Sequence, residues 1–231
     1  MSLPRLCRLI LSMHGWRKTC EWRALSLFIS ALIVFVSSSV FAALPDLRVN
    51  RPMLANTIEF TERTFASGDC ELDEGCARTS GNRRLMLFNV GIANVGQGDL
   101  VVGDPASKTN WFHFSTCHGH YHMTGFAVYR LKRLNGTVVV TSRKQGFCFR
   151  DDRAFQGSTK PARPYTCDFQ GISSGWQDIY DQSVECQWLD ITGVPAGNYN
   201  LEVTLNSKRW VRESNYGNNT VTIPVRIPRR R

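Results

Sequence analysis

Short runs of alternating apolar and polar residues recur from Leu44 onward, and Gly, Asn and Pro separate them. Alternation with a period of two puts the apolar side chains of a β-strand on one face, so each run predicts a strand with one buried and one wet side. Long stretches of helical periodicity are missing. The pattern therefore predicts a mainly β fold, a β-sandwich with long loops and little helix, in which Pro224 lies at a sheet edge or a bulge. The expected strands are residues 85–95, 126–134, 137–144, 200–206 and 220–227.

Three of the five histidines stand at every second position of the hexapeptide CHGHYH. In an extended strand, residues i, i+2 and i+4 point to one side, so His118, His120 and His122 would present three imidazoles together. The aromatic residues at 111–114 and the strand-like run at 126–131 favour extended chain here. Neutral imidazoles bind copper, zinc, nickel or iron, and the spacing does not choose among these metals. The competing interpretation is a cluster of surface histidines.

The N-terminal residues 1–42 have the pattern of a secretory signal. Basic residues come first, an apolar run follows at 25–41, and small residues precede Ala42. We expect cleavage after Ala42 and a single domain over residues 43–231, either secreted or periplasmic. A retained membrane anchor is the alternative, because the apolar run lies at the short end of a spanning helix.

The charge of the chain is less informative than its formal net value of +9 suggests, because five of its basic residues belong to the leader. The remaining domain is only mildly basic, and part of its charge lies in the arginine run at 229–231, which we interpret as a solvated tail. Basic and aromatic residues do not interleave as in nucleic-acid-binding motifs. Nucleic acid is therefore not an expected partner.

Cysteines are numerous in the domain that follows the leader. Their even number in an exported domain predicts a disulfide framework, although the sequence alone does not choose the pairing. Zinc ligation is the competing use, but no pair has the C-x-x-C spacing typical of such sites. The six cysteines are Cys70, Cys76, Cys117, Cys148, Cys167 and Cys186.

An Asn-Gly pair at 135–136 predicts a β-hairpin, because this dipeptide favours the two-residue type I′ turn. The strands at 126–134 and 137–144 would then pair and bring Lys144 near the histidines. In strict register, however, Lys144 would face away from them. A bulge that resets the parity, for which Gly125 is the candidate, would be needed to turn it toward the histidine face.

Five blocks of sequence can be read together in chain order. They are CHGHYH at 117–122, KQGFC at 144–148, DIY at 178–180 leading to CQWLDIT at 186–192, PAGNY at 195–199 and ESNYGNN at 213–219. In content and order they resemble the catalytic domain of the lysyl oxidases, and the resemblance runs from Asp46 to Ile227. Trp176 and the stretch 151–156 stand where the animal enzymes have cysteines, and the chain ends soon after Ile227. It therefore resembles a compact bacterial member of that family.

The resemblance implies that His118, His120 and His122 are copper ligands. It implies that Lys144 and Tyr180 combine into the cofactor lysine tyrosylquinone. The implied activity is an oxidative deamination of primary amines, either lysine side chains of proteins or small amines, which consumes dioxygen and yields aldehyde, ammonia and hydrogen peroxide. Without the surrounding motifs, Lys144 would be interpreted as a solvated strand-end lysine and Tyr180 as a packing residue.

Such chemistry also needs a carboxylate that removes a proton from the carbon next to the amine, while the cofactor accepts the electrons. Asp151 follows the KQGFC block by three residues, and Asp178 precedes Tyr180 by two. Both are candidates for the base. Either could equally be a structural carboxylate that accepts hydrogen bonds in a loop.

The resemblance also bears on the disulfides, because the matching cysteines of similar enzymes pair. It implies the pairs Cys70–Cys76 and Cys117–Cys167. The two cysteines that remain each lie within a few residues of one half of the cofactor, so we predict a Cys148–Cys186 disulfide that holds these two segments together. Two free buried thiols are the alternative.

A second class of function uses the same histidines. A non-catalytic, metal-binding β-sandwich, such as a copper-handling or matrix-binding protein, would need neither Lys144 nor Tyr180. Because both residues stand in matching contexts, the amine oxidase is the favoured hypothesis. The amine could be a protein lysine or a small molecule, and a membrane would be a partner only if the leader were retained.

Overall fold

The computed structural model describes residues 7–10, 17–20, 43–146, 148–163 and 165–230. The chain divides into two units, Met1–Val40 and Phe41–Arg231. In the first unit, strands β1 (Cys7–Ile10) and β2 (Arg17–Cys20) form an antiparallel pair. The apolar run and the cleavage site predicted for the leader lie outside the described residues. Among the residues that are described, no helix combines the length and apolar character needed to cross a membrane.

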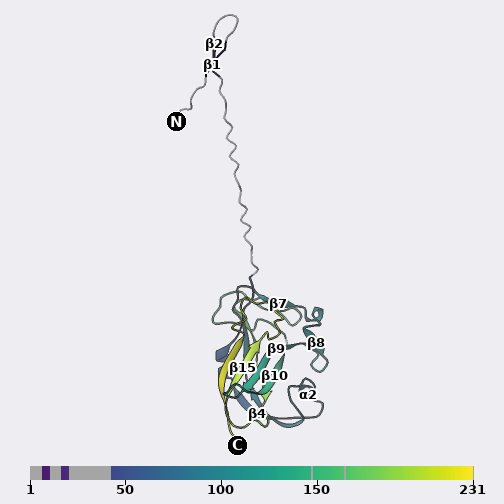
Figure 1. The fold of residues 1–231 in the computed structure, drawn as a ribbon. Helices are drawn as coiled ribbons and strands as arrows, with labels where there is room; N and C mark the ends of the chain where they lie inside the picture. Colours follow the sequence, from purple (N-terminus) through teal and green to yellow (C-terminus); the bar gives the residue numbers. More distant parts are fainter. Residues whose placement is uncertain (1–6, 11–16, 21–42, 147, 164, 231) are drawn as a thin grey trace. The chain divides into compact units, whose positions relative to one another are not determined.

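Antiparallel sheets dominate the second unit (Figure 1). In the part of the chain that the structure describes, the largest sheet has the order β10-β9-β15-β16, and β8 pairs with the beginning of β9. Its strands are β8 (Phe112–Ser115), β9 (His120–Lys132), β10 (Val138–Gly146), β15 (Gly197–Leu205) and β16 (Thr220–Ile227). A second sheet has the order β11-β13-β6-β3, formed by β3 (Leu47–Val49), β6 (Val90–Asn94), β11 (Arg153–Ala154) and β13 (Trp176–Tyr180).

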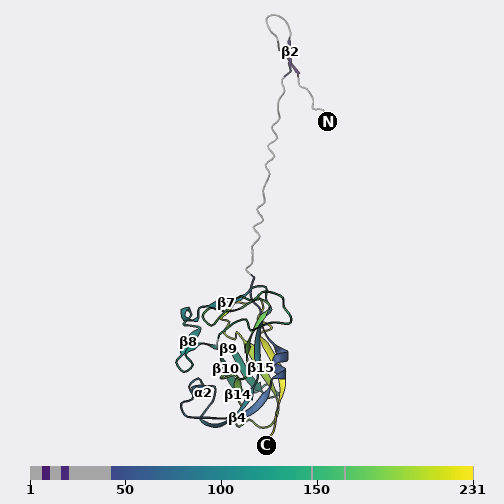
Figure 2. The same cartoon turned by 180° about the vertical axis from the view of Figure 1, so that it is seen from behind.

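Smaller elements complete this unit. A third sheet, β14-β5-β4, is formed by β4 (Glu59–Phe65), β5 (Gly81–Leu87) and β14 (Trp188–Asp190), and β7 (Leu100–Gly103) pairs with β12 (Gln170–Ile172). The helices are short: α1 (Arg51–Asn56), α2 (Cys70–Asp73) and the 3-10 turn η1 (Pro105–Ser107). Both views of the ribbon place α2 and β8 on the same side of the domain, which becomes important for the site (Figure 2).

A single hydrophobic core joins the two larger sheets. Tyr129 and Leu201 come from one sheet and Leu47 and Ile92 from the other, and each is at most 1% exposed. Burial of this apolar surface is the main force that holds the layers together. Because both sheets bury side chains in one cluster, they pack face to face as in a β-sandwich, so the predicted mainly β fold is confirmed.

The strands at the C-terminal end follow the alternating pattern closely. Along β15, Tyr199, Leu201, Val203 and Leu205 are buried while the residues between them are partly exposed. Within the described residues β16 pairs with β15 alone, so it is an edge strand. The prediction that Pro224 lies at an edge is confirmed, and the missing N–H of proline costs no ladder hydrogen bond there.

The strand predicted over 85–95 is wrong as one element, because the chain changes sheets in its middle. It divides into β5 and β6, which belong to different sheets. Between them, the backbone N–H of Asn89 donates to Thr57 Oγ1 at 2.9 Å. The Asn89 side chain also donates to Asp181, at 3.0 Å. Hydrogen bonds to side chains thus replace the ladder at the point where the strand breaks.

The predicted β9–β10 hairpin forms, but its turn differs from the expected one. Arg133 O accepts from Gly136 N at 2.9 Å, Arg133 N donates to Thr137 O at 2.8 Å, and only Gly136 of the Asn-Gly pair has a positive φ, of 88°. The connection is therefore a three-residue loop with a left-handed glycine, and the type I′ prediction is wrong. Asn135 accepts from Thr137 N through its side chain, which stabilises this alternative turn.

A register shift occurs on β9 at Gly125, as expected. Arg143 is opposite Val128, whereas Gln145 is opposite Thr124, and Gly125 has a φ of 71° that favours glycine. The shift amounts to two residues, an even number, so it does not by itself move Lys144 to the face of the sheet that carries the histidines, as the prediction required. Lys144 lies between the two pairs, and its side chain is outside what the structure describes.

Candidate metal centre

The hairpin formed by β8 and β9 carries the three histidines of the CHGHYH motif. Ser115 is opposite His120, so the strand resumes at His120 and the residues between form a turn. Gly119 allows this turn, because its φ of 70° is costly for other residues and its N–H donates to Ser115 O at 2.8 Å. The prediction of one strand for all three histidines is therefore wrong: His120 and His122 share a strand, whereas His118 belongs to the turn.

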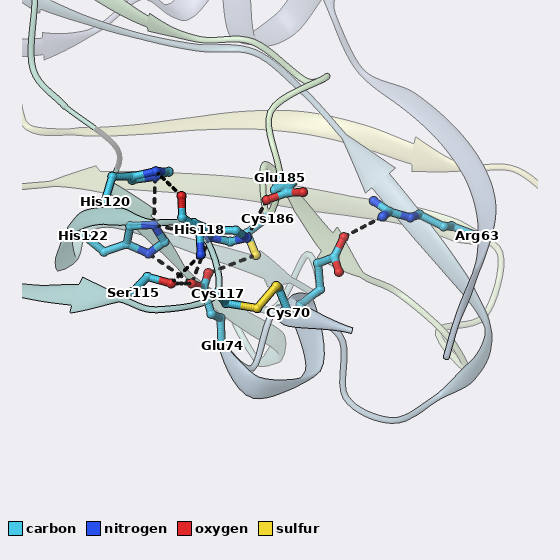
Figure 3. Close-up of a disulfide and its surroundings, with 11 residues drawn as sticks. Arg63, Cys70, Glu74, Ser115, Cys117, His118, His120, His122, Glu185 and Cys186 are labelled. Carbon is cyan, nitrogen blue, oxygen red and sulfur yellow. Dashed lines mark hydrogen bonds and ion pairs between the residues drawn. A yellow bond between two sulfur atoms is a disulfide. The ribbon is translucent and has the colours of Figure 1, made fainter. Parts of the chain in front are cut away.

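The three imidazoles nevertheless converge (Figure 3). His122 Nε2 lies 3.1 Å from His120 Nε2 and 3.3 Å from His118 Nδ1. Two nitrogens bound to one ion at about 2.0–2.1 Å lie about 2.9–3.4 Å apart when they subtend about 90–110°. The nitrogen spacing and the all-imidazole donor set therefore fit a transition metal such as copper or zinc.

The second nitrogen of each ring also has a neighbouring oxygen. His120 Nδ1 lies 2.9 Å from the carbonyl oxygen of His118, His122 Nδ1 lies 3.2 Å from Glu74 Oε1, and His118 Nε2 lies 2.5 Å from Glu185 Oε2. An acceptor at the outer nitrogen holds the N–H there and leaves the inner nitrogen as a lone-pair donor. The neighbouring oxygens therefore favour the tautomers in which the inner nitrogens of the three rings face one another.

Sequence reasoning missed the two carboxylates of this centre. Glu74 follows α2, and its side chain is 9% exposed, while Glu185 precedes Cys186 and is about half exposed. His113 on β8 was missed too, and its ring meets that of His122 edge-on at 5.5 Å. The feature of the sequence that could have indicated the two glutamates is that each stands within two residues of a cysteine.

The disulfides explain why these segments meet, and they contradict all three predicted pairings. Among the described residues the pairs are Cys70–Cys117, Cys76–Cys186 and Cys148–Cys167, with Cα atoms 5.8, 5.3 and 4.9 Å apart. Cys76 is buried beside Trp188 in a small core of its own, so it faces away from Cys70 and toward Cys186. Cys148 instead reaches Cys167, because Phe149 hydrogen-bonds to the segment just after it. This framework fits an exported protein.

Tyr180 lies at the end of β13, in the second sheet, and is 4% exposed. Asp178 precedes it by two residues and is 2% exposed. Burial raises the pKa of Asp178 well above its usual range, and the neighbouring Asp152 adds to the effect. Burial and the nearby Asp178 likewise raise the pKa of Tyr180. The structure thus puts a buried carboxyl beside the buried phenol.

Asp151, the other predicted base, lies in a different environment. One carboxylate oxygen accepts from Ser173 N at 2.7 Å, and the other accepts from Ser173 Oγ at 2.6 Å and from Arg163 N at 3.1 Å. These bonds tie the loop around residues 163–173 to the segment after β10. Such an acceptor role is that of a structural carboxylate.

A cavity of about 680 Å³ opens beside His120. Its walls combine the aromatic rings of Phe114 and Tyr121 with the carboxylates of Asp104 and Asp168. Phe114 is about half exposed. The histidine centre is therefore bordered by a cavity whose walls are both apolar and acidic.

Comparison with known proteins adds a separate line of argument. Residues 45–230 match the family model described as lysyl oxidase. The chain is 35% identical to lysyl oxidase homolog 3B of Danio rerio over 185 residues, which is 76% of this chain and 23% of that protein. It is also 35% identical to lysyl oxidase homolog 2 of Gallus gallus and of Homo sapiens, over 77% and 76% of this chain and 24% and 23% of those proteins.

The chain thus spans about a quarter of the length of the curated relatives it matches. A CARDB domain from Pyrococcus furiosus superimposes with a TM-score of only 0.30 and 14% identity, over 79% of this chain and 88% of that one, so it carries no argument about the fold. The family model covers nearly all of the second unit, including every block from which the resemblance was inferred. This chain belongs to the lysyl oxidase family.

Proposed function

We propose that this protein is an exported, copper- and quinone-dependent amine oxidase that deaminates primary amines, either protein lysines or small amines. Family membership supports a function of the copper amine oxidase type. The observation that carries the proposal is the convergence of three imidazole nitrogens in a chain that also holds a buried tyrosine beside a buried carboxyl. We further propose that residues 1–42 act as the secretory signal.

In this proposal His118, His120 and His122 hold the copper, and Lys144 and Tyr180 form the lysine tyrosylquinone. When present, these groups would pass two electrons and two protons from the amine to dioxygen, which leaves as hydrogen peroxide. Water provides the oxygen of the aldehyde, and ammonia departs. The copper assignment fits the donor set, because three neutral imidazoles suit copper well.

The protein's own residues have three further tasks. The cavity beside His120 admits the amine, and the carboxylates of Asp104 and Asp168 at its walls attract the ammonium form. Asp178 is the favoured base, because it lies beside Tyr180 and its burial makes it a stronger proton acceptor than an exposed aspartate. Asp151, whose oxygens accept three hydrogen bonds from a loop, is the less favoured base.

Phenylhydrazine labelling tests the proposal directly, since it modifies quinone carbonyls. Copper-loaded protein should become labelled, and peptide mass mapping should place the label on a cross-linked pair of peptides that contain Lys144 and Tyr180. His120→Ala should lose both copper and label, because it removes one of the three converging imidazole nitrogens. Lys144→Arg should keep copper and lose the label, since this lysine acts as a nucleophile in forming the cofactor.

The outcomes separate the two classes of function. Copper binding without any label in the wild-type protein would support the non-catalytic metal-binding protein instead. A normal label in Lys144→Arg, or full copper loading in His120→Ala, would contradict the site assignment.

A further inference from the structure

Glu74 occupies a central position among the metal-centre residues (Figure 3). Its Oε1 atom accepts from Ser115 Oγ at 2.9 Å and lies 3.0 Å from His118 Nδ1 and 3.2 Å from His122 Nδ1. One carboxylate oxygen therefore touches imidazoles from both the turn and the strand. Its contact with His122 is at the outer nitrogen of that ring, whereas its contact with His118 is at the inner nitrogen. The Glu74 side chain is 9% exposed, so little water competes for these contacts.

The backbone around Glu74 is fixed covalently on both sides. Four residues before it, Cys70 is bonded to Cys117, the neighbour of His118, and two residues after it, Cys76 is bonded to Cys186, the neighbour of Glu185. The Glu74 N–H also donates to Cys70 O at 2.9 Å, which closes α2. A helix of four residues has little stability of its own, so the disulfides account for its fixed place against the histidine turn.

We infer that Glu74 is a positioning residue for the metal: it orients the His122 ring at its outer nitrogen, and the two flanking disulfides hold Glu74 in place. The inference rests on the proposed function in one respect, the assignment of a metal to the three histidines. A carboxylate at the outer nitrogen fixes the tautomer of a metal-binding imidazole and raises its basicity, and its loss typically weakens metal binding about 10- to 100-fold.

The test compares four full-length proteins: wild type, Glu74→Ala, Glu74→Gln and Asp73→Ala. Asp73 is the matched control, because it is an exposed carboxylate in α2, next to Glu74 in sequence. Copper(II) affinity is measured by competition with a chelator, and the electron paramagnetic resonance spectrum of the bound copper is recorded. Circular dichroism of the metal-free proteins verifies that each is folded.

Glu74→Ala should raise the copper dissociation constant about 10- to 100-fold and alter the spectrum. Glu74→Gln keeps an acceptor oxygen without the charge, so its affinity should fall between those of Glu74→Ala and the wild type. Asp73→Ala should match the wild type in both measurements. The spectrum is the decisive readout, because a residue that only supported the fold would not change the environment of the bound ion.

Wild-type affinity and spectrum in Glu74→Ala would overturn the inference. If that variant does not fold, Glu74→Gln decides, and wild-type values there would overturn it equally. A wild-type protein that binds copper but shows no quinone would refute the proposed oxidase and leave the role of Glu74 intact. Absence of copper binding by the wild type would refute both.

Discussion

Tyr180→Phe separates the chemistry proposed for Tyr180 from its contribution to the fold. The variant keeps the aromatic ring that fills a buried position and removes only the hydroxyl. Without that hydroxyl the ring cannot be oxidised to a quinone, so phenylhydrazine labelling and amine oxidation should both disappear. The stability cost should be small, because a hydroxyl and its hydrogen bonds contribute only about 0.5–1.5 kcal/mol, whereas loss of the whole ring would cost about 3–5 kcal/mol.

Tyr129→Phe is the matched control. Tyr129 is fully buried, its hydroxyl donates to Gln187 Oε1 at 3.2 Å, and its phenol is close enough to raise the pKa of Tyr180. The same atom is removed from the same kind of environment, so the unfolding free energy in urea should fall by about 1 kcal/mol in both variants. Only Tyr180→Phe should lose the label. A labelled Tyr180→Phe, or equal loss of label in both variants, would refute the assignment of Tyr180 to the cofactor.

Two further predictions concern carboxylates. Burial raises the pKa of Asp178, so the Asp178 charge destabilises the fold increasingly as pH rises from about 4, the pKa in the unfolded chain, through the raised pKa of the folded protein. In Asp178→Asn, the free energy of unfolding in urea should depend less steeply on pH over this window. An unchanged slope would contradict the shift. Asp190 is the opposite case: burial opposes its charge, but hydrogen bonds from Thr192 and Arg83 hold its pKa below the usual value, so its stabilisation is lost as pH falls below about 4. Arg83 Nε and Nη2 lie 2.9 and 2.8 Å from Asp190 Oδ2, and only 14% of the arginine side chain is exposed. Asp190→Ala should therefore lower the free energy of unfolding by about 3–5 kcal/mol at pH 7. A loss under about 1 kcal/mol in urea unfolding would refute this.

Local pattern predicted the strands well where one face is buried. The alternation in 200–206 and 220–227 reports burial directly, because successive side chains of a strand face opposite sides. The run 85–95 did not reveal its change of sheet, since at the break Asn89 alone interrupts a sequence that is apolar on both sides of it. The switch depends on hydrogen bonds from Asn89 to Thr57 and Asp181, which are distant in sequence.

The histidine cluster was predictable as a group but not in its geometry. A strict i, i+2, i+4 spacing suggests one strand, and the left-handed backbone of Gly119 breaks that strand after His118. The three imidazoles still converge, because the turn brings His118 back toward the pair on β9. The glutamates beside the rings were beyond prediction, as they approach from segments 44 and 67 residues away from His118 in the chain.

The predicted disulfide pairings were wrong for a related physical reason. The resemblance implied Cys70–Cys76, but the pairing depends on where side chains point once the chain has folded. Cys76 is buried with Trp188, and this burial turns it toward Cys186. Tertiary packing therefore decides the pairing, and the sequence does not reveal that packing.

The construction of the metal centre implies an order of assembly. The β8–β9 hairpin is local in sequence, so His118, His120 and His122 can approach one another early. Glu74 and Glu185 are not local, and the disulfides Cys70–Cys117 and Cys76–Cys186 fasten the segments that carry them to the histidine turn and to each other. If Glu74 orients the His122 ring, high metal affinity follows disulfide formation, and a cofactor whose formation requires the bound metal comes last. An oxidising compartment is then a condition for building the site as well as for stabilising the fold.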